Sequence, residues 1–220
     1  MTLRTRLWRW LLFTVILTAV LFGLAGRLDL PLFWAYAGVC AVCVLGASLK
    51  VDPTLPRERW RPGPGAVDRG LLALLRVFGL AHLVVATLDA GRFHWSDTVP
   101  IGLQVAALGG FAAALALPMW AMASNRFFSS VVRIQSERGH TVVTEGPYRY
   151  VRHPGYLGIL IAIPCSALAL GSWLALAPAV VFSALTVYRT AFEDWFLRAN
   201  LGGYAGYVER VTYRLVPGVW

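Results

Sequence analysis

Five stretches with almost no charged residue constrain the fold more than any other feature of this sequence. They cover residues 10–26, 30–49, 71–88, 98–125 and 154–188. A helix needs about 20 consecutive apolar residues to cross a bilayer, and the last stretch is about twice as long. Gly171 and Ser172 near its middle, between two prolines, predict a tight turn. We therefore predict an all-α polytopic membrane protein with about six transmembrane helices, of which the last two form a hairpin over residues 154–188.

The charges between these stretches alternate along the chain. Arginines gather in the N-terminal arm, in residues 50–69, in residues 126–152 and in the C-terminal tail, whereas the first and third connections carry one arginine each. Because short cytoplasmic loops collect Lys and Arg, both termini are predicted to face the cytoplasm, together with residues 126–152. The net charge of +9 follows from the same bias and from attraction to anionic lipids. No nucleic-acid-binding motif accompanies it, so we expect no nucleic-acid partner.

Two features of the apolar stretches allow a second interpretation. The basic N-terminal arm, the apolar run after it and Gly23-Leu24-Ala25 resemble a cleaved signal peptide, although the alternation of loop charges favours a retained anchor. The three cysteines all fall within predicted spans, and Cys40 and Cys43 form a Cys-x-x-Cys pair. Since no further ligands accompany this pair, we interpret the cysteines as packing residues and expect no metal site.

Two ionisable residues, Arg76 and His82, lie inside a predicted span. Such groups are costly in hydrocarbon and are therefore candidates for a functional role. Arg76 is close enough to the cytoplasmic end to extend its charge towards water, and a hydrogen bond to a neighbouring helix would satisfy His82. On the opposite side of the membrane, Asp89 and Arg92 are three residues apart and are expected to form a structural pair.

The polar motif "GPYRYVRHPGYLG" stands directly before and at the start of the last apolar stretch. Pro154 suits the first position of a helix, because its missing N–H would have no partner there. Arg152, His153 and the free backbone amides of that helix predict a positively charged pocket that accepts an anion. The neighbouring tyrosines offer flat faces for an aromatic or cationic ligand.

A second polar segment follows the hairpin, and in it Arg189 and Glu193 are four residues apart and share a helix face. The hairpin returns this segment to the side of the membrane on which the first motif lies. The sequence therefore predicts one cytoplasmic site built from both segments.

These elements together resemble a known superfamily. The motif "TVVTEGPYRYVRHPGYLG" is followed, after the hairpin, by R-x-x-x-E-D-x-x-L from Arg189, then by G-x-Y-x-x-Y and by R-L-V-P. This order is similar to that of the isoprenylcysteine carboxyl methyltransferase and phospholipid methyltransferase superfamily. The resemblance covers residues 125–217 and divides the single membrane domain, 1–220, into four spans within 1–124 and a methyltransferase-like region. One departure is Asp194, since the family usually carries a second glutamate after Glu193, and this puts a role for Asp194 as a base in doubt.

The resemblance implies an enzyme that binds S-adenosylmethionine at the cytoplasmic face and methylates a lipophilic acceptor in the membrane. The residues that it assigns to cofactor binding are Gly146, Tyr148, Arg152, His153, Pro154, Tyr156, Gly158 and Glu193. Acceptor binding is assigned to Asn125, Arg189 and Tyr207, and catalysis to Arg189 and Glu193. If the acceptor is a carboxylate, which we favour, Arg189 would orient it while Glu193 holds the guanidinium. If it is an amine, as in phospholipid methylation, Glu193 or Asp194 would have to remove a proton.

Two other functions stay open on the sequence alone. One is an NADPH-dependent membrane reductase of the sterol-reductase type, whose C-terminal region has a similar plan. The other is a non-enzymatic membrane module or transporter, in which Arg76 and His82 would line the pathway. Lys50 is the single lysine among 20 basic residues, which is typical of a GC-rich genome and indicates a bacterial inner membrane.

Overall fold

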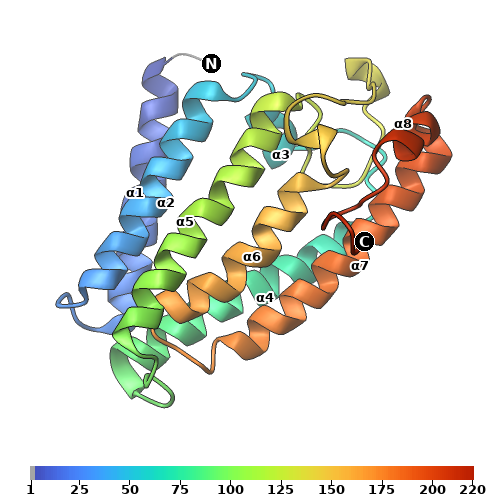
Figure 1. Cartoon of the computed structure of the whole chain (residues 1–220). Coiled ribbons are helices and arrows are strands. Elements are labelled where there is room, and N and C mark those ends of the chain that lie inside the picture. The colour runs from blue at the N-terminus through green and yellow to red at the C-terminus, as the bar shows by residue number, and fades with distance from the viewer. Residues whose placement is uncertain (1–2) are drawn as a thin grey trace.

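The computed structural model describes residues 3–220, and these residues form helices and no strand. The predicted all-α class is therefore confirmed for this part of the chain. The α-helices, shown in Figure 1, are α1 (Leu3–Ala25), α2 (Pro31–Lys50), α3 (Leu55–Trp60), α4 (Arg69–Leu88), α5 (Ile101–Ser124), α6 (Pro154–Ala169), α7 (Leu176–Asn200) and α8 (Tyr204–Arg210). Each of the five uncharged stretches is helical, and the last one is divided between α6 and α7.

Within residues 3–220, four helices are long and apolar enough to cross a membrane, which fits an integral membrane protein. They are α1, α2, α4 with its short extension to Phe93, and α5. Helix α6 is apolar but has 16 residues, and α7 has 25 residues with charged side chains in its second half. The six crossings and the orientation of the chain stay predictions. The predicted turn is present, because Gly171 has a φ of +84° between the two helices, a conformation that glycine adopts without steric cost.

The two ends of the helical bundle differ in the segments that they carry (Figure 1). The N-terminal arm, α3, the segment 125–153 and α8 lie at one end, which we call the charged end because most arginines of the connections fall there. The connections from α1 to α2, from α4 to α5 and from α6 to α7 lie at the other end. Helix α5 packs along α6 and also contacts α2, while α7 packs against α4 and α6.

Small residues allow α5 and α6 to approach closely. Gly158 of α6 faces Pro118 and the carbonyl oxygen of Ala114 on α5, and a Cβ atom at position 158 would lie 2.4 Å from the Pro118 ring and 2.6 Å from that oxygen. Such contacts between backbones are a main source of helix association in a bilayer, where burial of apolar surface adds little.

His82 is satisfied within the bundle. Its Nε2 atom lies 3.1 Å from the hydroxyl of Ser166 on α6, and its Nδ1 atom lies 2.5 Å from the Gly79 carbonyl oxygen. The same serine hydroxyl is 2.9 Å from the hydroxyl of Tyr36 on α2. A hydrogen bond to a neighbouring helix thus accounts for this intramembrane histidine, as the structural interpretation predicted.

The predicted pair between Asp89 and Arg92 is wrong. Asp89 is fully buried and accepts hydrogen bonds from the backbone N–H and hydroxyl of Ser96 and from the hydroxyl of Ser172. Arg92 instead donates to the carbonyl oxygen of Gly23 on α1. The acid therefore joins the end of α4 to the α6–α7 turn, and hydroxyl groups rather than an arginine satisfy it.

We expect Gly158→Ala to lower the midpoint of thermal unfolding in detergent, because the added methyl group would force α5 and α6 apart at a cost of about 1–3 kcal/mol. The matched control is Gly109→Ala on α5, where a Cβ atom meets nothing within 4 Å. That control should be neutral or slightly stabilising. Equal midpoints for the two variants would contradict the packing described here.

Candidate functional site

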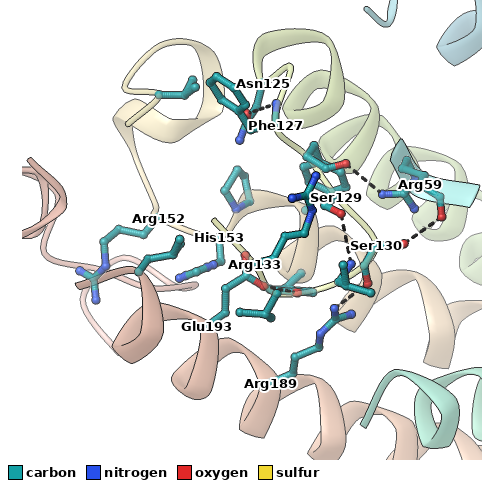
Figure 2. A pocket seen from close by; sticks show the side chains of 18 of the residues that line it. Arg59, Asn125, Phe127, Ser129, Ser130, Arg133, Arg152, His153, Arg189 and Glu193 are labelled. Carbon is teal, nitrogen blue, oxygen red and sulfur yellow. Dashed lines mark hydrogen bonds between the residues drawn. The ribbon is translucent and has the colours of Figure 1, made fainter. Parts of the chain in front are cut away.

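A cavity of about 820 Å³ opens at the charged end, within the range of small-molecule sites. Its polar end is formed by residues before α6, by the first turn of α6, by the last half of α7 and by α8. It includes Tyr148, Arg152, His153, Tyr156, Glu193, Tyr204 and Tyr207. Its apolar end lies between α3, α4 and the middle of α7, and includes Trp60, Leu72, Leu75, Gly79, Phe182 and Thr186. The segment 127–133 lines the cavity between these helices (Figure 2).

Asp194 is the carboxylate beside the cavity that accepts the most hydrogen bonds among the described residues. Its carboxylate accepts hydrogen bonds from Arg152 at 2.7 and 3.1 Å, from Arg214 at 2.9 Å and from the Tyr204 hydroxyl at 3.0 Å. The Nε2 atom of His153 lies 3.3 Å away. Burial raises the pKa of Asp194, but these bonds from His153, Arg152 and Arg214 outweigh it and hold the pKa well below its ordinary value. The side chain is therefore an ionised structural acceptor.

The bonds to Asp194 change the expected role of Arg152. Its guanidinium is neutralised by that carboxylate and also donates to the carbonyl oxygens of Val211 and Thr212. Arg152 and His153 both line the cavity at the start of α6, and both contact the Asp194 carboxylate. Their direct effect is to fix the C-terminal segment against the first turn of α6.

Tyr156, Glu193 and Arg189 meet where the two ends of the cavity join. The Tyr156 hydroxyl donates to Glu193 Oε2 at 2.5 Å, and the Arg189 guanidinium lies 5.6 Å from the centre of the Tyr156 ring. The expectation that Glu193 holds Arg189 is wrong. Arg189 forms its ion pair with Asp68, at 2.6 Å, and donates to the Ser130 carbonyl oxygen at 2.6 Å (Figure 2). Glu193 thus remains available to a ligand beside the tyrosine.

The remaining predicted residues fall into two groups. Asn125 donates to the Tyr148 hydroxyl at 3.1 Å, and Tyr207 donates to the Tyr148 carbonyl oxygen at 2.7 Å. Asn125 and Tyr207 therefore lie at the polar end of the cavity, although the sequence analysis assigned them to binding of the methyl acceptor. Gly146 and Gly158 lie outside the cavity lining, where they allow close contacts with α5, whereas the other predicted residues all line it.

Two acids that hold lining residues in place were missed, because they come from the first connection with many arginines. Asp68 precedes α4 and accepts a hydrogen bond from the Val132 N–H, in addition to pairing with Arg189. Glu58 of α3 binds Arg133 through two bonds of 2.9 Å. Residues 52–69 are rich in proline and in charged residues, which could have marked this connection as part of the site. That composition does not indicate which residue each charged side chain contacts.

Comparisons with known proteins give a consistent class. Residues 105–198 match the model of the isoprenylcysteine carboxyl methyltransferase (ICMT) family. The chain is 32% identical over 134 residues to a probable protein-S-isoprenylcysteine O-methyltransferase of Oryza sativa subsp. indica. The aligned residues make up 60% of this chain and 68% of the relative. Protein-S-isoprenylcysteine O-methyltransferase B of Arabidopsis thaliana is 33% identical over 90 residues, 40% of this chain and 46% of the relative.

A bacterial protein with a different name is also similar. The cobalt-zinc-cadmium resistance protein CzcN of Cupriavidus metallidurans is 30% identical over 167 residues, 73% of this chain and 70% of the relative. Within residues 3–220 we find no group of three or more His, Cys, Asp or Glu side chains that could hold a metal ion.

The apolar helices, the cavity at their charged end and these relatives define a membrane methyltransferase. The chain belongs to the isoprenylcysteine carboxyl methyltransferase family.

We expect Asp194→Asn to destabilise the protein by about 3 kcal/mol, because two arginines would lose their buried acceptor. Thermal unfolding in detergent at several pH values checks this. The native pKa is lowered, so the carboxylate stabilises the wild type above the ordinary pKa of 3.8 and loses this effect as the pH falls further. The Asp194→Asn variant has no carboxylate at this position, so its stability should not show this decrease at low pH. Glu209→Gln, at an exposed acid of α8, is the control, and a similar midpoint for both variants would contradict the central role of Asp194.

Proposed function

We propose that this protein transfers the methyl group of S-adenosylmethionine to a carboxylate of a lipophilic, membrane-borne acceptor. The observation that carries the proposal is a cavity that joins a tyrosine-rich polar end to an apolar end between membrane helices. The names of the plant relatives, which are methyltransferases of protein-S-isoprenylcysteine, support a lipid-linked acceptor of this kind.

The polar end suits the methyl donor. Glu193 is a carboxylate that lines the cavity, and it can accept hydrogen bonds from an ammonium group or from ribose hydroxyls. Tyr148, Tyr156, Tyr204 and Tyr207 supply aromatic faces for a flat base and for the positively charged sulfur. S-adenosylmethionine, when bound, supplies a methyl group on a sulfonium. The residues present therefore fit this cofactor.

The apolar end suits the hydrocarbon part of the acceptor. Leu72, Leu75 and Gly79 of α4 and Phe182 of α7 line this part of the cavity, and the two helices pack against each other. A Cβ atom at Gly79 would lie 3.2 Å from the Phe182 ring, so these two residues limit the width of the cavity. An acceptor with a hydrocarbon tail would bury that tail here and present its polar group to Arg189.

The bonding of the two acids favours a carboxylate acceptor over an amine. Methyl transfer to a carboxylate forms one C–O bond, breaks the S–CH₃ bond and requires no proton transfer, so positioning and exclusion of water supply most of the acceleration. An amine acceptor would need a base. The Asp194 carboxylate already accepts hydrogen bonds from two arginines and a tyrosine, and Glu193 accepts one from the Tyr156 hydroxyl. Arg189 lines the cavity, and in this proposal it orients the reacting carboxylate.

We place this site at the cytoplasmic face of a bacterial inner membrane. The arginines of the connections gather at the end of the bundle where the cavity opens, and the positive-inside rule assigns that end to the cytoplasm. S-adenosylmethionine is a cytoplasmic metabolite, so this orientation gives the cavity access to the cofactor.

Isothermal calorimetry of the detergent-purified protein tests the proposal. We expect S-adenosylhomocysteine to bind with a micromolar Kd and NADPH to show no binding. Glu193→Gln should weaken S-adenosylhomocysteine binding about tenfold or more, since a charge-assisted hydrogen bond is worth about 1.5–3 kcal/mol.

Glu145→Gln, at an exposed acid before the polar motif, is the matched control and should bind as the wild type does. Binding of NADPH alone would instead favour a reductase of the sterol-reductase type. Binding of neither nucleotide would count against any enzyme that uses these cofactors.

A further inference from the structure

The short helix α3 brings a guanidinium to the cavity from outside the segment that matches the family model. Arg59 is on α3, whereas the match begins at residue 105. The backbone of this residue is fixed, because its carbonyl oxygen accepts a hydrogen bond of 2.9 Å from the Ser130 hydroxyl. Its neighbour Glu58 is held by Arg133 and by the Ser129 hydroxyl. The position of Arg59 at the cavity is therefore set by bonds to the segment 127–133.

The side chain of Arg59 lines the cavity without an acidic partner. Its guanidinium lies 5.3 Å from the centre of the Phe128 ring and donates a long bond of 3.5 Å to the Phe128 carbonyl oxygen. Within residues 3–220, no carboxylate lies within 4.0 Å of it. Of the other arginines that line the cavity, Arg133, Arg152 and Arg189 each have such a partner, whereas Arg76 is exposed. Arg59 is thus a half-buried charge that faces the cavity without compensation.

Arg59 and Arg189 converge on one short stretch of backbone. Arg59 donates to the carbonyl oxygen of Phe128 and Arg189 to that of Ser130, two residues further on (Figure 2). Burial lowers the pKa of Arg59, and the positive charge of Arg189 lowers it further. This proximity of two like charges is unfavourable unless an anion lies near both.

The charged side chains that face the cavity therefore differ between its two ends. At the apolar end, Arg59, Arg76 and Arg189 line the cavity, and Asp68, which is not part of the lining, pairs with Arg189. At the polar end, the Glu193 carboxylate lines the cavity and accepts a hydrogen bond from Tyr156, and no arginine of residues 3–220 lies within 4.0 Å of it. A cationic methyl donor suits the second environment, and an anionic acceptor suits the first.

We propose that Arg59 is a specificity-determining residue that binds the anionic group of the acceptor together with Arg189. This inference rests on the proposed function, because it concerns the acceptor of the same site. Arg59 recognises charge, and its guanidinium can donate two parallel bonds to a carboxylate. The site therefore selects lipophilic acids and rejects amides and amines of the same hydrocarbon chain.

Two lipophilic probes that differ only in charge test this inference. They are N-acetyl-S-farnesyl-cysteine, which has a free carboxylate, and its carboxamide, and calorimetry in saturating S-adenosylhomocysteine gives both Kd values. We expect the wild type to bind the carboxylate at least about tenfold more tightly than the carboxamide. Arg59→Gln should abolish most of this preference while its binding of S-adenosylhomocysteine stays unchanged. Arg59→Lys should keep a part of it, because the charge remains but the planar fork is lost.

The matched control is Arg57→Gln, which removes an exposed arginine from the same helix and should leave the preference unchanged. Equal preference in the Arg59→Gln variant and the wild type would overturn the inference, as would a wild type that binds both probes equally or neither. Failure of the proposed function is a separate result, since it would show as no binding of S-adenosylhomocysteine to the wild type.

Discussion

The buried carboxylate of Asp194 is the interaction on which the site depends. It connects three parts of the chain that are far apart in sequence, namely the start of α6 through Arg152, α8 through Tyr204 and the C-terminal tail through Arg214. With 1% of its surface exposed, a carboxylate of this kind is stable only because charged and polar donors surround it. The polar end of the cavity exists because these donors draw α8 and the tail over the ends of α6 and α7.

A second group of ion pairs gives the cavity its other wall. Asp68 joins Arg189 of α7 to the backbone of Val132, and Glu58 of α3 joins Arg133 of the same segment. The segment 127–133 has no regular secondary structure, so these side chains replace the backbone bonds that a helix would supply. Its carbonyl oxygens can then accept hydrogen bonds from Arg59 and Arg189, the two arginines proposed to bind the methyl acceptor.

The helices could be predicted from the sequence because their signal is local. Uncharged runs gave all five helical stretches, and Gly171 between prolines gave the turn of the hairpin. The partners of the charged residues could not be predicted, because they depend on contacts across more than 60 positions, as between Arg133 and Glu58. The spacing of four residues therefore predicted a contact between Glu193 and Arg189. In the structure, Arg189 forms an ion pair with Asp68 instead, and Glu193 accepts a hydrogen bond from Tyr156.

The position of the cavity has a consequence for the first two helices. Among the described residues, α1 and α2 contribute nothing to the cavity lining, and many side chains of α1 point outwards. An exchange of one apolar residue for another on the outer face of α1 would alter contacts with lipid and leave the site untouched. The evolution of these two helices is therefore constrained by bilayer thickness and by packing against α4 and α5, and not by the reaction. They are the part of the protein that can diverge in sequence, or acquire a partner within the bilayer, while the chemistry stays the same.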